Sequence, residues 1–282
     1  MMVPRAVAAA VGSDRAFDYL RKMIYESAAI VLDEDKRYLL EARLGPLLLG
    51  ERLTSFDELV DRLTRPDGSA LRQRVIEAMA THETSFFRDK RAFQALRYQV
   101  IPDLLARHGH TRRMNFWCGA ASTGQEAYSI ALTLKEYDRV LTDWKVEILA
   151  SDISNEVLTR ARAGVFSQHE VNRGLSPLML SRFFESLANG WRLRDDVRRM
   201  VKFRQMNLID SWPNVRDLDV AFLRNVLIYF DVPTKRRIFE KLCQTLRIGG
   251  YLFLGSVEST LNLTDKFKEV SLGKGIIYQR TN

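Results

Sequence analysis

The sequence predicts an α/β protein: a small N-terminal helical domain, then an open, mainly parallel sheet wrapped by helices, with a small β-subdomain inserted into the second part. Three observations lead to this prediction. The first third has apolar residues at helical spacing and no β-run before Arg113. After Arg113, short apolar runs alternate with helical segments, which is typical of a parallel sheet. Between Gly164 and Val201 that alternation breaks, which indicates an insertion.

Four helices are expected in the helical domain. They are placed after Ser13, from about residue 36 to 44, after Ser55, and after the Pro-Asp-Gly turn at 66–68. Ser13 and Ser55 are good N-cap residues because a serine hydroxyl can accept a hydrogen bond from a free amide of the first turn. Gly45 and Pro46 are expected to interrupt the second helix, since proline lacks the amide hydrogen that an interior turn needs.

The second part is expected to hold five strands and a final pair. The strands are predicted at 114–118, 146–151, 201–206, 218–223 and 251–254, with the pair near Phe267 and at 275–279. Helices are predicted at 124–136, 155–163 and 233–246. In the insertion, a helical run at 177–187 and a turn at Asn189 and Gly190 precede a short apolar run at 191–193, which together indicate a β-hairpin.

Composition limits the classes of protein. The chain has 282 residues, of which 46% are apolar and 28% charged, so it can bury a core in one large domain or two modest ones. Its net charge of +8 is spread along the sequence and suggests an acidic partner: nucleic acid, anionic lipid or an acidic protein surface. Cys118 and Cys243 lack metal-ligand spacing, so we expect no metal and no disulfide.

Targeting signals are not apparent. No apolar run approaches the roughly 20 residues that span a bilayer. The best N-terminal candidate, residues 6–11, is too short for the core of a signal peptide. We therefore expect a protein of the reducing cytoplasm that does not insert into membranes.

The most informative motif is FWCGAASTGQE at residues 116–126. It leaves a strand, turns through small residues and enters a helix, which places backbone amides and a helix N-terminus at the edge where open α/β sheets bind ligands. The glycine spacing is that of a phosphate loop, but Gln125 and Glu126 replace its Lys-Ser/Thr pair, and a carboxylate would repel a triphosphate. A nucleoside with a positive substituent remains, and S-adenosylmethionine fits Glu126 by charge. Alternatively, the turn only joins strand to helix.

Polar residues also follow the other predicted strands. Asp152 ends the second strand, where an acid can accept hydrogen bonds from both ribose hydroxyls; alternatively, it caps the next helix, a role that Ser154 could fill equally. Asn207, which precedes Leu208, could pair with the edge of adenine. In the RNVLIYF segment at 224–230 the apolar residues are core, which leaves Arg224, Asn225 and Tyr229 to be explained.

A polar cluster with an aromatic pair, THETSFFRD, lies far upstream at 81–89. Five blocks now stand in order: ETSFFRD, ASTGQEAYS, ASDI, NL and RNVLIYF. In that order they resemble the chemoreceptor glutamate methyltransferases of bacterial chemotaxis, the CheR family. The resemblance covers about residues 15 to 280, and it is specific because five separated blocks coincide.

The resemblance implies a Rossmann-like S-adenosylmethionine-dependent methyltransferase domain and a set of site residues. It divides the chain into a helical domain at 1–80, a linker with the cofactor-site loop and a helix at 81–112, and the methyltransferase domain at 113–282, with the inserted β-subdomain at about 165–200. It implies that the cofactor is held by His82, Thr84, Arg88, Glu126, Asp152, Asn207, Leu208, Arg224 and Asn225. Arg88 and Tyr229 would border the transferred methyl group and act in catalysis.

The resemblance also implies a partner and a reaction. The enzyme would form γ-glutamyl methyl esters on the cytoplasmic helical domain of a chemoreceptor, which sets receptor adaptation, and would leave S-adenosylhomocysteine. We expect a monomer that binds no nucleic acid.

This chain departs from the family pattern at three places. Position 82 is commonly Asn but here is His82, and the residue before Arg224 is commonly Cys but here is Leu223. Where many members carry receptor-docking arginines, this chain reads GPLLL at 45–49. The insertion is also short, which disfavours tethering to a receptor's C-terminal peptide. Two alternatives stay open: a methyltransferase for RNA or a small molecule, and a non-catalytic S-adenosylmethionine-binding signalling module.

Overall fold

The computed structural model describes residues 13–213, 215–272 and 275–281, which form two compact units. One unit holds the described residues up to Thr81 together with Tyr229–Asp231. The other holds His82–Ile228 and the described residues from Val232 onward. The expected site residues fall in the second unit, with the exception of Tyr229.

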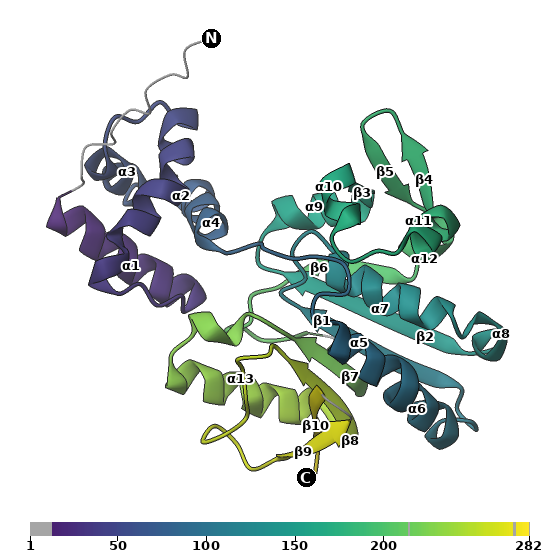
Figure 1. The fold of residues 1–282 in the computed structure, drawn as a ribbon. Coiled ribbons are helices and arrows are strands. Elements are labelled where there is room, and N and C mark those ends of the chain that lie inside the picture. The colour runs from purple at the N-terminus through teal and green to yellow at the C-terminus, as the bar shows by residue number, and fades with distance from the viewer. Residues whose placement is uncertain (1–12, 214, 273–274, 282) are drawn as a thin grey trace. The chain divides into compact units, whose positions relative to one another are not determined.

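The first unit is helical, as predicted. Its described residues form α1 (Asp14–Ala28), α2 (Arg37–Gly50), α3 (Phe56–Leu63) and α4 (Ser69–Met79), drawn in purple and blue in Figure 1. Ser13 and Ser55 cap α1 and α3 with their hydroxyls, which accept from the amides of Ala16 and Glu58. The helices bury one shared apolar core that includes Leu20, Leu44, Leu59, Leu63 and Val75.

The predicted interruption of α2 at Gly45 and Pro46 is wrong. The helix runs on to Gly50 with Pro46 inside it. Leu44, Leu47 and Leu48 are all buried in the helical core. Burial of these leucines on both sides of Pro46 outweighs the loss of one helical hydrogen bond, so tertiary packing overrides the local preference.

The second unit is built on a seven-stranded sheet with the order β6-β2-β1-β7-β8-β10-β9. The strands are β1 (Arg113–Gly119), β2 (Lys145–Asp152), β6 (Val201–Gln205), β7 (Leu218–Leu223), β8 (Leu246–Leu254), β9 (Phe267–Leu272) and β10 (Gly275–Arg280). The first five strands in the sheet order are parallel, and β10 pairs antiparallel with both of its neighbours. This confirms the predicted fold class. The strand expected at 251–254 begins earlier, at Leu246, and a register shift separates the pairing of Leu246 with Leu218 from that of Tyr251 with Val220.

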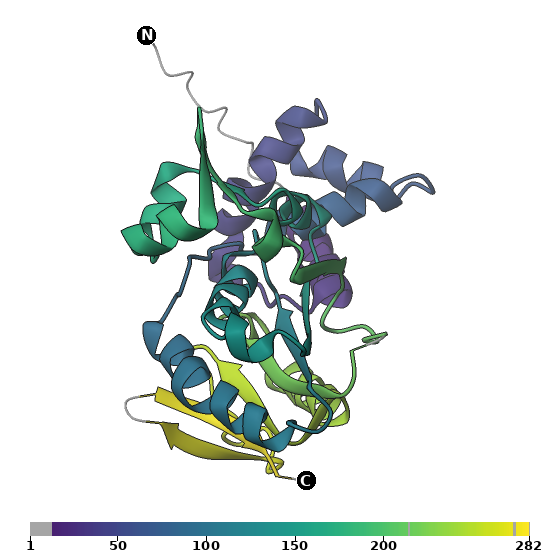
Figure 2. The ribbon, with the colours of Figure 1, turned by 90° about the vertical axis from the view of Figure 1, so that its right-hand side faces the viewer.

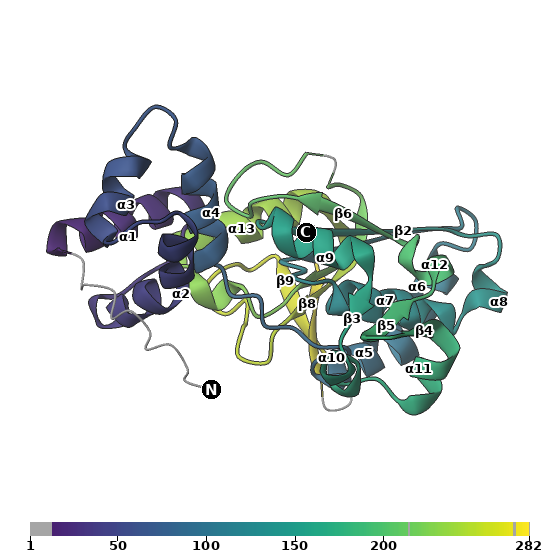
Figure 3. The ribbon, with the colours of Figure 1, turned by 90° about the horizontal axis from the view of Figure 1, so that it is seen from above.

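Helices cover both faces of this sheet. They are α5 (Lys90–Ala95), continued by a π-helical segment (Leu96–Val100) and α6 (Ile101–Arg107), then α7 (Gln125–Lys135), α8 (Asp138–Leu141), α9 (Asn155–Ala163) and α13 (Val232–Thr245). Figures 2 and 3 show α13 on the opposite face from α5, α6 and α7. The carboxyl ends of β1, β2 and β7 therefore meet at one edge, between two helical layers.

The insertion forms a small antiparallel sheet with the order β3-β5-β4, which confirms the predicted hairpin. It comprises β3 (Val165–Phe166), α10 (Gln168–Asn172), α11 (Pro177–Phe183), β4 (Phe184–Leu187), β5 (Gly190–Leu193) and α12 (Asp195–Arg198). The helical run predicted over 177–187 is wrong beyond Phe183. Phe184 is buried and adopts extended backbone angles because it pairs with Leu193 across the hairpin.

Candidate functional site

The β1–α7 turn is shaped by left-handed backbone. Ala120, Ser122 and Gly124 have φ angles of 54°, 52° and 96°. A Cβ on Gly124 would lie 3.0 Å from the Cβ of Ala161 and 3.3 Å from the ring of Phe203, so this position needs glycine on two counts. The turn thus brings the first residues of α7 close against the neighbouring helix and strand.

Asp152 links that turn to the end of β2. Its carboxylate accepts hydrogen bonds from the amide of Ser122 at 2.8 Å and from that of Ser154 at 3.0 Å. Burial raises the pKa of this carboxyl, while the two amide bonds oppose the rise. The cap of α9 is Ser154, whose hydroxyl accepts from the amide of Val157. Asp152 is therefore not the helix cap, and it stays available at the sheet edge.

Glu126 and Arg224, expected as separate contacts, form a buried ion pair. Arg224 Nη1 lies 2.6 Å from Glu126 Oε2, and their side chains are 1% and 11% exposed. The second Nη of Arg224 lies 3.5 Å from Asp89 Oδ2. The other oxygen of Glu126 accepts from the thiol of Cys118 at 3.5 Å, and burial raises the pKa of that thiol. The charge of Glu126 is thus balanced within the protein by a guanidinium.

The 81–89 segment lies against the same edge. The carbonyl of His82 accepts from the hydroxyl of Ser122 at 2.8 Å, and its Nδ1 lies 4.0 Å from Asp152 Oδ1. The amide of Phe87 donates to Ser129 of α7. Arg88 is half-buried and donates to the carbonyl of Glu83 at 2.9 Å. The aromatic pair anchors the segment in the core: Phe86 and Phe87 are buried, and Phe86 packs edge-on to Phe166 and Phe184.

Other expected residues lie farther along the sheet or outside it. Asn207 follows β6, and its side-chain oxygen accepts from the amide of Ile209. Leu208 is buried. Asn225 follows β7 with a φ of 56°. Thr84 is half-buried in the 81–89 segment. Tyr229 belongs to the helical unit, where its carbonyl accepts a hydrogen bond from the amide of Val31.

The structure thus gathers four of the expected residues around the β1–α7 turn in two separate groups: His82 and Asp152, which both accept hydrogen bonds from Ser122, and the ion pair of Glu126 and Arg224. Sequence reasoning missed Asp89, the second partner of Arg224, and Glu258, which accepts four backbone amides. Asp89 stood in the quoted 81–89 block, but its role depends on a contact 135 positions along the chain.

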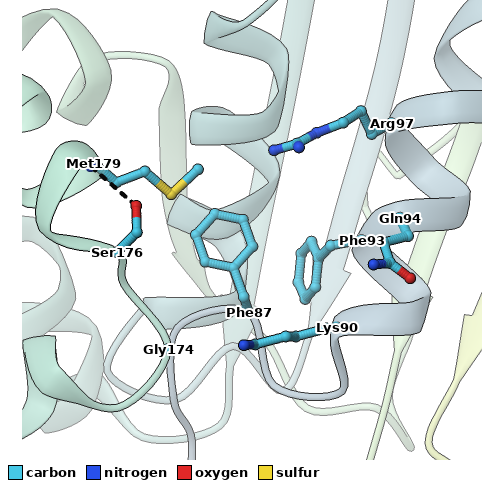
Figure 4. Close-up of a pocket in the computed structure, with 8 residues that line it drawn as sticks. All are labelled: Phe87, Lys90, Phe93, Gln94, Arg97, Gly174, Ser176 and Met179. Atoms are coloured by element: carbon cyan, nitrogen blue, oxygen red, sulfur yellow. Dashed lines mark hydrogen bonds between the residues drawn. The ribbon is translucent and has the colours of Figure 1, made fainter.

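Two pockets border the segment that ends at Asp89. One, of about 170 Å³, lies between α5 and the segment leading into α11 (Figure 4). It is lined by Phe87, Lys90, Phe93, Gln94, Arg97, Gly174, Ser176 and Met179. The other, of about 200 Å³, is lined in part by Asp89, Gly255 and Glu258. None of the expected site residues lines either pocket.

Within the described residues, no group of three or more His, Cys, Asp or Glu side chains is placed to hold a metal ion. In the same part of the chain, no helix is both long and apolar enough to cross a membrane.

An open parallel sheet with a glycine turn after its first strand and an acid at the end of the second defines a nucleoside-binding α/β protein. Comparison with known proteins is more specific. Residues 82–276 match the CheR methyltransferase SAM-binding domain, and residues 15–80 match the CheR all-alpha domain. The chain belongs to the CheR methyltransferase family. The predicted family and the predicted cofactor, S-adenosylmethionine, are thereby confirmed.

Curated relatives agree over nearly their whole length. A chemotaxis protein methyltransferase 1 of Pseudomonas aeruginosa is 39% identical, and the match covers 93% of this chain and 97% of the relative. A chemotaxis protein methyltransferase Cher2 of Pseudomonas putida is 38% identical with the same coverage. One from Vibrio parahaemolyticus is 37% identical over 95% of this chain and 97% of its own. This protein is a methyltransferase of chemotaxis.

Proposed function

We propose that this protein methylates glutamate carboxylates on the cytoplasmic helical domain of a chemoreceptor, forming γ-glutamyl methyl esters and S-adenosylhomocysteine. The observation that carries the proposal is the placement of Asp152 and of the Glu126–Arg224 ion pair at the shared edge of β1, β2 and β7, in a chain whose relatives are named chemotaxis protein methyltransferases. A receptor partner also implies that the enzyme works in the cytoplasm.

The residues at that edge fit the cofactor chemically. Each oxygen of Asp152 already accepts a backbone amide, and a carboxylate oxygen has a second lone pair, so both can accept a ribose hydroxyl. Asn207 and Leu208 would hold the adenine, and Asn225, His82 and Thr84 the remaining polar atoms. Arg224 would act mainly by fixing Glu126, which then faces the cofactor's ammonium as one half of an ion pair.

The chemistry needs no general base. When bound, S-adenosylmethionine supplies an electrophilic methyl group. A free glutamate titrates near 4.3, so the attacking carboxylate is already ionised at neutral pH. The protein's contribution is to position the carboxylate and to exclude water, because hydration would favour the charged reactants. Arg88 would orient a carboxylate, and Tyr229 would hold the attacking group through its hydroxyl.

Receptor binding and cofactor binding are assigned to different parts of the chain. We propose that residues 1–80 and the basic residues of the inserted subdomain at about 165–200 meet the receptor, and that residues 113–282, with the loop and helix at 81–112, carry the cofactor. The net charge of +8 suits the acidic face of a receptor helix. The helix α2 carries Leu47 and Leu48 into its own core, so docking must rely on other residues of the helical unit.

The test of the proposed function is transfer of a labelled methyl group. The protein is incubated with methyl-labelled S-adenosylmethionine and receptor cytoplasmic fragments, and alkali then releases volatile methanol from carboxyl esters. Label released as methanol supports the proposal. Cofactor binding without label on any receptor of the source organism would instead favour a non-catalytic module.

Tyr229→Phe separates chemistry from binding. The substitution keeps the ring and removes only the hydroxyl, so we expect turnover to fall at least about tenfold while affinity for S-adenosylhomocysteine changes less than about twofold. Methanol release and calorimetry measure the two quantities. Equal losses would move Tyr229 from the reacting centre to the cofactor contacts.

A further inference from the structure

Glu258 makes an unusual set of hydrogen bonds just beyond β8. Its Oε1 accepts from the amides of Val226 at 2.9 Å and Leu227 at 2.7 Å. Its Oε2 accepts from the amides of Asn225 at 2.8 Å and Gly255 at 2.7 Å. One carboxylate thus gathers three successive amides of the turn after β7 and one amide of the turn after β8.

This carboxylate supports an uncommon backbone shape. Asn225 has a φ of 56°, in the left-handed region, and three consecutive amides that point to one place form a concave anion site. Such hydrogen bonds to a charged acceptor are the strong kind. Glu258 therefore holds the turn after β7 in place from within the protein, as a bound anion would.

The same two strand ends are tied a second time. Arg224, the first residue after β7, donates through Nε to the carbonyl of Leu254 at the end of β8, at 3.4 Å. Gly255 then has no room for a side chain: a Cβ there would lie 2.7 Å from Asn225 Nδ2 and 2.7 Å from Glu258 Oε2. The side chain of Asn225 thus lies where a side chain at position 255 would displace it.

We propose that Glu258 is a positioning residue of the methyltransferase: it sets the Asn225–Leu227 turn so that Asn225 presents its side chain to the cofactor. The inference rests on the role of Asn225 in the proposed function. It adds a residue that touches neither cofactor nor substrate, and it accounts for a carboxylate that the ion pair of Glu126 and Arg224 does not involve.

Two variants disturb the hydrogen bonds between Glu258 and the Asn225–Leu227 turn, one by changing Glu258 and the other by changing Gly255. Glu258→Gln keeps the size but turns an amide NH₂ toward two backbone donors, so one pair of hydrogen bonds is lost. Gly255→Ala forces Asn225 and Glu258 apart by steric contact. In each, calorimetry should show the Kd for S-adenosylhomocysteine rising about tenfold, which corresponds to about 1.4 kcal/mol.

Two controls separate positioning from general destabilisation. Glu240→Gln makes the same chemical change at an exposed position on α13. Leu104→Ala opens a cavity in the core beneath α6, where Leu104 is fully buried, and so lowers stability without touching either turn. Both should bind S-adenosylhomocysteine within about twofold of the unmodified protein, measured well below their melting temperatures.

The outcomes divide cleanly. A Kd unchanged in Glu258→Gln or in Gly255→Ala overturns the inference, and so does an equal rise in Leu104→Ala, because the effect would then follow stability alone. The assay uses no receptor and no turnover. If the unmodified protein binds S-adenosylhomocysteine but methylates no receptor, the proposed substrate fails while the role of Glu258 is still decided by the binding data.

Discussion

Two buried carboxylates, Glu126 in the first turn of α7 and Asp152 at the end of β2, are held in opposite ways. Glu126 has a guanidinium partner in Arg224 and a thiol donor in Cys118. Asp152 accepts hydrogen bonds from the backbone amides of Ser122 and Ser154, His82 Nδ1 lies 4.0 Å from it, and burial raises its pKa. A carboxylate whose charge is neutralised inside the protein belongs to the framework of the site. A carboxylate held mainly by backbone amides gains most from a ligand that brings further donors.

The largest effect is expected when the ion pair of Glu126 and Arg224 is broken. Arg224→Met leaves Glu126 buried without its cation, and removing one partner of a buried ion pair costs about 3–5 kcal/mol. The free energy of unfolding of the α/β unit should fall by that amount. All four tryptophans lie in this unit, so fluorescence during urea denaturation reports it without a signal from the helical unit.

A double variant supplies the control. Arg224→Met combined with Glu126→Met removes both charges, so it should be more stable than Arg224→Met alone by at least about 1 kcal/mol. A loss below about 1 kcal/mol in the single variant would mean that Glu126 is hydrated or neutral, and the contrast with Asp152 would disappear.

The second largest effect is expected at Asp152, the proposed contact to the ligand. Asp152→Ala removes the acceptor proposed for two ribose hydroxyls, so affinity for S-adenosylmethionine should fall by about 1–3 kcal/mol while the fold survives. Calorimetry measures the affinity, and circular dichroism shows whether the fold is retained. In Glu126→Gln, the free energy of cofactor binding should weaken by less than the free energy of unfolding falls. If instead Glu126→Gln weakens binding as much as Asp152→Ala without loss of stability, the two carboxylates have been assigned the wrong way round.

The same two carboxylates show what a sequence can predict. The strand, small-residue turn and helix around residues 116–126 follow from local spacing, and an acid at the next strand end follows from the geometry of parallel sheets. Asp152 was therefore placed correctly at the sheet edge. Its alternative as a helix cap could be decided only when the hydroxyl of Ser154 was seen to accept from Val157.

The pairing of Glu126 with Arg224 lay beyond the sequence. These residues are 98 positions apart, and they meet because β1 and β7 are paired in a register that sets Gly119 opposite Leu223. The four amides that donate to Glu258 come from two different turns, so no local sequence motif could predict these hydrogen bonds. The errors at Pro46 and at 184–187 have the same origin, since packing against distant residues overrode local preference.

The smallest expected effect is a pH dependence of stability and of ligand affinity that arises from Asp152. Because burial raises the pKa of Asp152 above its ordinary 3.8, the folded protein binds a proton there at a pH where the unfolded chain does not. This group's contribution to stability therefore falls as pH rises through that interval. Ribose hydroxyls favour the ionised carboxylate, so ligand affinity has the opposite sign: it is full above the raised pKa and is lost as pH falls through it.

Calorimetry with S-adenosylhomocysteine between pH 7.5 and 5 tests this sign. Affinity of the unmodified protein should fall as the pH is lowered, whereas Asp152→Asn should bind more weakly but with little pH dependence. His82 Nδ1 lies 4.0 Å from Asp152 Oδ1, and the interaction of His82 with Asp152 opposes the rise in the pKa of Asp152. In His82→Asn the loss should therefore begin at higher pH. A fall in affinity that persists in Asp152→Asn would assign the titration to another group, and Asp152 would then resemble Glu126 in having its charge settled by the protein alone.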